Sequence, residues 1–153
     1  MSKKLLFLAL PLLFFLSSWS GDKPVYTFTA DEVSVSNQLI DMVNDYRLSI
    51  GLDALKRCKI ADDLAAEHTY YMASQGQISN DHFENRLETL ENKKNIEDIS
   101  ENMGYGNSAE ETMEAYLNNV WLKVNVEGDY TCTGVAVKKD QNGKYYFTQI
   151  FYK

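Results

Sequence analysis

Histidine and cysteine are scarce in this chain, which has two of each among 153 residues. The catalytic triad of a serine hydrolase would have to include one of the two histidines. The chain also lacks the Gly-x-Ser-x-Gly sequence that surrounds the nucleophilic serine in many such enzymes. Glycine-rich phosphate-binding loops are absent as well. A catalytic zinc ion normally has three protein ligands, so two histidines suffice only if carboxylates help. These absences leave few kinds of catalytic site open.

The longest apolar run lies near the N-terminus, where Leu5–Leu16 follows Lys3 and Lys4. The small residues Ser18 and Ser20 then occupy the two positions that a signal peptidase recognises. This pattern predicts a secretory signal peptide over residues 1–20. The run is shorter than the roughly 20 residues of a transmembrane helix, and no cysteine for lipid attachment lies near the cleavage point. We expect a secreted or periplasmic protein without a transmembrane anchor after cleavage.

Acidic side chains outnumber basic ones by 22 to 15. Removal of residues 1–20 takes away two basic side chains and no acidic one, which gives a formal net charge of −9. An acidic surface repels phosphate backbones, so we expect no nucleic-acid partner. The remaining 133 residues suit one domain with its own core, which we expect to be a monomer.

The two cysteines are Cys58 and Cys132. An oxidising compartment favours a disulfide between them. The alternative is that they are two small buried apolar side chains. A catalytic thiol is a weaker hypothesis, because neither cysteine has a histidine close to it in the sequence.

The first part of the mature chain reads as an extended lead-in followed by a helix. Residues 21–29 contain Pro24, which discourages a helix. Thr29 and Glu32 then form a capping-box pattern, and the apolar spacing predicts a helix that reaches Ile50. We expect a short extended bridge over residues 54–56.

Two further helices are predicted before the middle of the chain. The second, over residues 60–75, places His68 on its inner face, where we expect a hydrogen-bonded core histidine rather than a ligand. His82 follows in a turn, and a short third helix carries the apolar side chains of residues 83–90. A polar loop is expected over residues 91–95.

The last third of the chain changes from a helical pattern to a strand pattern. Ser108 opens a fourth predicted helix, whose inward face extends to Val120. The side-chain pattern changes to a period of two in residues 133–137 and 145–151, which predicts two strands. Asn142-Gly143 between them predicts a tight hairpin with positive φ at both positions. The order of elements indicates an α+β domain with helices packed on an antiparallel sheet.

The best candidate for chemistry is a histidine–carboxylate pair. Glu101 lies in Ile99–Gly106, which reads as a bend because Gly104 and Gly106 permit unusual backbone angles. His82 lies in another turn, and loops can converge into a cleft. An imidazole and a carboxylate suit general acid–base catalysis or zinc binding.

Five segments together resemble the CAP, or SCP, superfamily, which groups cysteine-rich secretory proteins, antigen 5 and plant pathogenesis-related proteins. Two of them resemble its first two helices, two resemble its first histidine motif and its Gly-Glu-Asn motif, and the fifth resembles its last strand. In chain order they are Leu39–Leu55, Leu64–Met72, Asp81–Phe83, Ser100–Gly104 and Lys144–Phe151.

The resemblance implies an α-β-α sandwich over residues 30–153, with a small antiparallel sheet between helical layers. It also implies a central cleft lined by two histidines and two acidic residues, which holds a divalent metal in several members. By position, His82 matches the first histidine, Glu101 matches the first glutamate and Asn102 follows it in the motif.

The second half of that cleft is changed in this chain. Leu122 occupies the place of the second histidine, and Asn119 lies where some members have the second acidic residue. Ser100 also replaces the usual glycine before Glu101. Because leucine offers no lone pair, we expect no metal, no other cofactor and no catalytic residue.

The same resemblance sets Cys58 and Cys132 on segments that could be neighbours in the sheet, which supports the disulfide. It also leaves Val120 and Trp121 beside the changed position as possible contacts for a ligand or a partner.

Three hypotheses for the function follow. The first is a secreted, non-catalytic binding or interaction module for an unknown protein. The second is a carrier of a lipid or another small apolar ligand. The third is a hydrolase that uses His82 and Glu101 with a bound water or metal.

Overall fold

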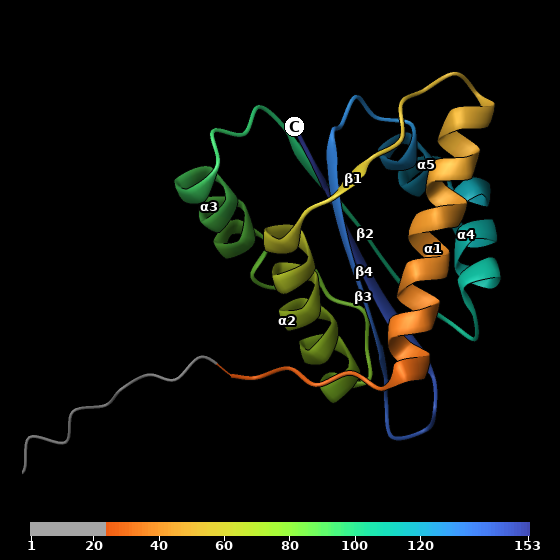
Figure 1. The fold of residues 1–153 in the computed structure, drawn as a ribbon. Coiled ribbons are helices and arrows are strands. Elements are labelled where there is room, and N and C mark those ends of the chain that lie inside the picture. Colours follow the sequence, from red (N-terminus) through yellow and green to blue (C-terminus); the bar gives the residue numbers. More distant parts are fainter. Residues whose placement is uncertain (1–23) are drawn as a thin grey trace, which may run out of the picture.

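The computed structural model describes residues 24–153, so the expected signal peptide over residues 1–20 lies outside the described residues. In the described part, no helix is both long enough and apolar enough to cross a membrane. Residues 24–153 form five helices and four strands (Figure 1). They are α1 (Ala30–Ser49), β1 (Lys56–Arg57), α2 (Lys59–Gln75), α3 (Phe83–Lys93), β2 (Ile99–Gly106), α4 (Ala109–Asn118), α5 (Val120–Val126), β3 (Cys132–Lys139) and β4 (Tyr145–Tyr152).

The four strands form one sheet in the order β1-β3-β4-β2. β3 and β2 both pair antiparallel with the central β4, and the two-residue β1 pairs parallel with β3 at one edge. Helices α1, α4 and α5 lie on one side of the sheet and α2 and α3 on the other (Figure 1). The α-β-α sandwich is therefore confirmed, with a parallel pair only at the β1 edge.

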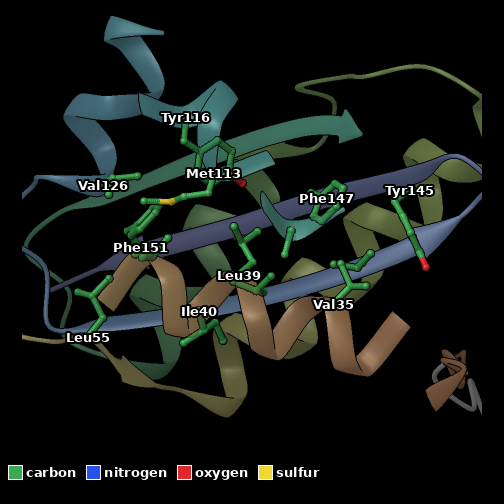
Figure 2. Close-up of a cluster of buried hydrophobic side chains, with 14 residues drawn as sticks. Val35, Leu39, Ile40, Leu55, Met113, Tyr116, Val126, Tyr145, Phe147 and Phe151 are labelled. Carbon is green, nitrogen blue, oxygen red and sulfur yellow. The ribbon is translucent and has the colours of Figure 1, made fainter. Parts of the chain in front are cut away.

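Alternation along β4 supplies both faces of the sheet with apolar side chains. Tyr145, Phe147 and Phe151 point toward α1 and α4 and belong to the larger core cluster (Figure 2). On the opposite face, Ile150 and Tyr152 join the smaller cluster under α2. All eight residues of β4 are buried, as expected for a strand covered by helices on both faces.

Close approach of α2 to the sheet depends on a glycine in β3. A Cβ atom at Gly134 would lie 2.2 Å from the carbonyl carbon of Ala61 and 2.2 Å from the backbone nitrogen of Asp62. A side chain there would collide with the helix backbone, so only glycine allows this spacing. The Asp62 carboxylate also accepts a hydrogen bond from the backbone N–H of Val135, at 3.0 Å.

The disulfide between Cys58 and Cys132 is confirmed. The two Cα atoms lie 5.7 Å apart. β1 pairs with β3 in a register that places Lys56 opposite Cys132. The bridge therefore ties the edge of the sheet to the start of α2, as the expected neighbouring strands implied.

Most of the expected helix ends agree with the structure. Thr29 and Glu32 form the capping box of α1, and α2 ends at Gly76, whose φ is +67°. Two predictions in the later helices were wrong. α3 continues to Lys93 instead of giving way to a loop at residue 91. The fourth helix ends at Asn118, because Asn119 is extended and starts a separate helix, α5.

The expected bend around Glu101 was wrong, because Ile99–Gly106 is an eight-residue strand, β2. It pairs with β4 along its whole length, from Ile99 opposite Tyr152 to Gly106 opposite Tyr145. Pairing with a strongly apolar partner strand thus outweighs the local preference of its two glycines for a turn.

The two-residue hairpin at Asn142-Gly143 was also wrong. Only Gly143 of the pair has a positive φ, at +81°. The turn is longer and is built on Asp140, whose carboxylate accepts the backbone N–H groups of Asn142 and Lys144 at 2.8 and 2.9 Å. An aspartate that bonds the backbone ahead of it is a common alternative to the tight turn.

Candidate functional site

A buried ion pair lies at the centre of the candidate site. The Arg86 guanidinium, from α3, donates to both carboxylate oxygens of Glu101 on β2. The Nε–Oε1 distance is 2.6 Å and the Nη2–Oε2 distance is 2.7 Å. The two side chains are only 5% and 2% exposed. This two-point geometry is the strongest form of arginine–carboxylate contact, and it engages both oxygens of Glu101.

The remaining donor nitrogen of Arg86 holds a neutral histidine. Its Nη1 donates to the carbonyl of Asp81 at 2.8 Å and lies 3.1 Å from Nδ1 of His68. Nε2 of His68 lies 2.8 Å from the carbonyl oxygen of Ser79. Since a carbonyl can only accept, Nε2 carries the proton and Nδ1 accepts from Arg86. Burial and then the charge of Arg86 lower the pKa of His68.

The structure places His82 at the rim of this cluster. It caps α3 with a φ of +61°, and its side chain is exposed. Its ring packs edge-on against Tyr71, with the ring centres 5.5 Å apart. Tyr71 in turn donates to the carboxylate of Asp81 at 2.5 Å. Among residues 24–153, no hydrogen bond or ion pair joins His82 to Glu101, so the expected pair is not assembled.

The polar residues after Glu101 serve to hold α5 in place. Asn102 is fully buried, donates to the carbonyl of Leu122 at 3.0 Å and accepts from Asn125 at 2.8 Å. The Asn119 side chain accepts the backbone N–H of Trp121 at 3.0 Å and so caps α5. The Leu122 side chain packs against the larger core cluster. These residues account for the position of α5 without any ligand.

Val120 and Trp121 lie open to solvent. They are 70% and 78% exposed, and Val124 on the same helix is 57% exposed. The expected inward orientation of Val120 was therefore wrong. Their helix has only seven residues.

A hollow of about 550 Å³ opens between α2 and α3 and reaches the buried cluster. Its floor includes His68 and Arg86, and His82 lies on its lining. The other lining residues are mostly aromatic or polar and come from α2, α3 and the segment before α1: Tyr26, Leu64, Glu67, Tyr70, Tyr71, Ser74, Asn85 and Thr89.

Residues 40–151 match the family model described as the cysteine-rich secretory protein family, CAP. The chain belongs to this family. The match spans most of the 153 residues and includes both Arg86 and Glu101. No functionally curated protein matches the sequence.

Three solved structures have the same fold at low sequence identity. An outer surface protein from Borrelia burgdorferi has 17% identity and a TM-score of 0.70, with 83% of this chain and 96% of that one covered. A cysteine-rich secretory protein from Staphylococcus aureus has 20% identity and a TM-score of 0.69, with 82% and 40% covered. An extracellular SCP-domain protein from Bacillus anthracis has 22% identity and a TM-score of 0.70, with 83% and 44% covered. This CAP chain spans less than half of the last two proteins.

The residues of this CAP domain do not fit the divalent metal that several members of the superfamily hold. Arg86 occupies both oxygens of Glu101, so a metal would have to displace a buried guanidinium. Leu122 provides no lone pair, and its side chain packs against the core. In residues 24–153, no three His, Cys, Asp or Glu side chains are grouped as a metal site requires.

Arg86 is not among the site residues that the sequence predicts. One signal was available, since Phe83, Arg86 and Leu90 follow the i, i+3, i+7 spacing of a single helix face. A charged residue on an apolar face requires a buried partner of opposite charge. That rule would have directed attention to the carboxylates, and thus to Glu101.

Proposed function

We propose that this CAP domain is a secreted, non-catalytic binding module. The observation that carries the proposal is the buried two-point contact between Arg86 and Glu101. Both oxygens of a carboxylate held in this way already accept hydrogen bonds from a buried guanidinium, so an ion would have to compete with that contact. His82 then remains as a single exposed imidazole, which makes a hydrolase based on the two residues a poor alternative.

Secretion and the domain boundaries belong to the same proposal. The N-terminal pattern supports a signal peptide over residues 1–20, a lead-in over residues 21–29 and the CAP domain over residues 30–153. The structural relatives include an outer surface protein and an extracellular protein by their own descriptions. A protein acting outside the cell would also keep its disulfide oxidised.

The hollow between α2 and α3 supports a binding function rather than a hydrolase. A concave site with aromatic walls and a few polar groups is the usual form of a ligand site. A carrier of an apolar ligand would need Val120, Trp121 and Leu122 to enclose a site. Val120 and Trp121 are exposed and line neither of the two hollows beside α2, and Leu122 packs against the core, so these residues enclose no such site.

The experiment that tests the proposal is calorimetric titration of the purified mature protein with zinc. We expect no site tighter than about 1 µM, and we expect the His82→Ala variant to give the same isotherm. A nanomolar site that the His82→Ala variant loses would show that His82 and Glu101 do form a metal centre, and the proposal would then be wrong.

A further inference from the structure

The hollow at His82 continues into a second one along α2. The second hollow is also about 550 Å³, and its apolar part is formed by Phe28, Ile60 and Leu64. The two hollows share Tyr26, Leu64, Glu67 and Thr89 as lining residues. Because they share these residues, the two hollows form one groove beside α2, which lies with α3 on one side of the sheet (Figure 1). We call it the α2–α3 groove.

The aromatic side chains of the groove are held in fixed positions. The rings of Tyr26 and Phe28 pack on Tyr70, with centres 5.0 and 5.5 Å away. The Tyr70 hydroxyl bonds to the backbone of Thr27. The ammonium group of Lys138 lies 4.8 Å from the centre of the Tyr70 ring. This cluster therefore already accepts one cation from within the chain.

The uncompensated charge in the first hollow is negative. Glu67 is exposed, lines both hollows and takes part in none of the ion pairs found among residues 24–153. The positive charge of Arg86 in the floor is neutralised by Glu101. In the second hollow, Asp63 pairs with Lys59 at 2.7 Å.

A cation is the group that these features complement. A carboxylate in a hollow lined by tyrosine rings attracts an ammonium or guanidinium group by charge and through the ring faces. The negative net charge of the whole chain, −7, would also draw a basic partner toward it. Lys93 lines only the second hollow, where its positive charge would repel a cation of the partner. We therefore expect that cation to lie beside Glu67 in the first hollow.

We propose that the α2–α3 groove binds an extended peptide segment of a partner protein through one lysine or arginine side chain. The cation contacts Glu67 between Tyr26 and Tyr71, and a neighbouring apolar side chain of the peptide enters the hollow lined by Phe28 and Ile60. This assignment rests on the proposed binding function and names the class of its partner.

The test uses two acetylated and amidated pentapeptides, Gly-Leu-Lys-Leu-Gly and the same peptide with norleucine in place of lysine. Their binding to the mature protein is followed by two-dimensional NMR. We expect the lysine peptide to bind with a dissociation constant below about 1 mM and the norleucine peptide to bind at least about tenfold more weakly. Equal affinities, or no binding of the lysine peptide at 1 mM, would overturn the assignment.

Two matched variants locate the contact. Glu67→Gln should weaken the lysine peptide about tenfold and leave the norleucine peptide unchanged. Glu88→Gln removes an exposed carboxylate of α3 that does not line the groove, and it should change neither affinity. Unchanged lysine binding by Glu67→Gln would overturn the assignment. The zinc titration is a separate measurement, so a failure of the proposed function can be distinguished from a failure of this assignment.

Discussion

Replacing Arg86 with methionine is the most direct test of how the candidate site is built. Methionine keeps much of the side-chain length but removes the charge and every donor nitrogen. Three partners then lose their hydrogen bonds: the Glu101 carboxylate, the carbonyl of Asp81 and Nδ1 of His68. The most costly loss is at Glu101, which is 2% exposed and cannot turn to water.

The expected loss can be bounded from known buried pairs. Removing one partner of a buried ion pair costs about 3–5 kcal/mol, because the other charge remains buried without compensation. A single domain typically has about 5–15 kcal/mol of stability. We therefore expect the Arg86→Met variant to lose a large part of its free energy of unfolding.

Urea unfolding at pH 7.5 of the wild type, Arg86→Met, Glu101→Gln and the double variant measures this effect. The double variant should be more stable than Arg86→Met alone, with a coupling free energy of about 2 kcal/mol. It also keeps the test usable if Arg86→Met does not fold. The matched control is the exposed pair Lys59–Asp63, whose side chains are 85% and 63% exposed. Lys59→Met should cost less than about 1 kcal/mol. An Arg86→Met loss as small as that of the control would refute the reasoning.

Three further predictions concern the fold around the site. Replacing Cys58 and Cys132 by alanine removes a disulfide between residues that are 74 positions apart. This should lower the free energy of unfolding by about 2–4 kcal/mol in urea titrations. A change below about 0.5 kcal/mol would contradict this. Folding lowers the pKa of His68. Its contribution to stability is therefore complete above about pH 6.5, the pKa of histidine in the unfolded chain, and it is lost at lower pH. The free energy of unfolding should fall from pH 7.5 to 5.5, and less steeply in His68→Gln; equal slopes would contradict the assignment. Gly134→Ala should cost about 3 kcal/mol in thermal or urea unfolding, and a neutral effect would show that α2 can move away from β3.

The parts of the fold that local patterns specify could be predicted from the sequence. The capping box at Thr29, the end of α2 at Gly76 and the alternation in β4 each depend on residues a few positions apart. The strand at Glu101 does not. Its sequence has two glycines and little alternation, and it is extended because the backbone of β4 pairs with it. Such long-range pairing leaves no local pattern to read.

The site shows the same division between local and long-range information. The resemblance placed His82 and Glu101 in one cleft by position, but it could not say which side chain Glu101 meets. That partner, Arg86, is 15 residues away and belongs to another element. The expected role of Asn119 in the cleft also depended on position alone, whereas the structure uses it to cap α5.

Arg86 also explains how a helix with few apolar residues stays on the sheet. Only two side chains of α3 are buried, Leu90 and Arg86 itself. Leu90 alone contributes about 1.5–3 kcal/mol of burial free energy, which is little for a helix of eleven residues. The Arg86–Glu101 pair supplies the second attachment and ties α3 to β2 at its first turns. Because α3 is one wall of the groove, the ion pair that engages both oxygens of Glu101 also holds that wall in place.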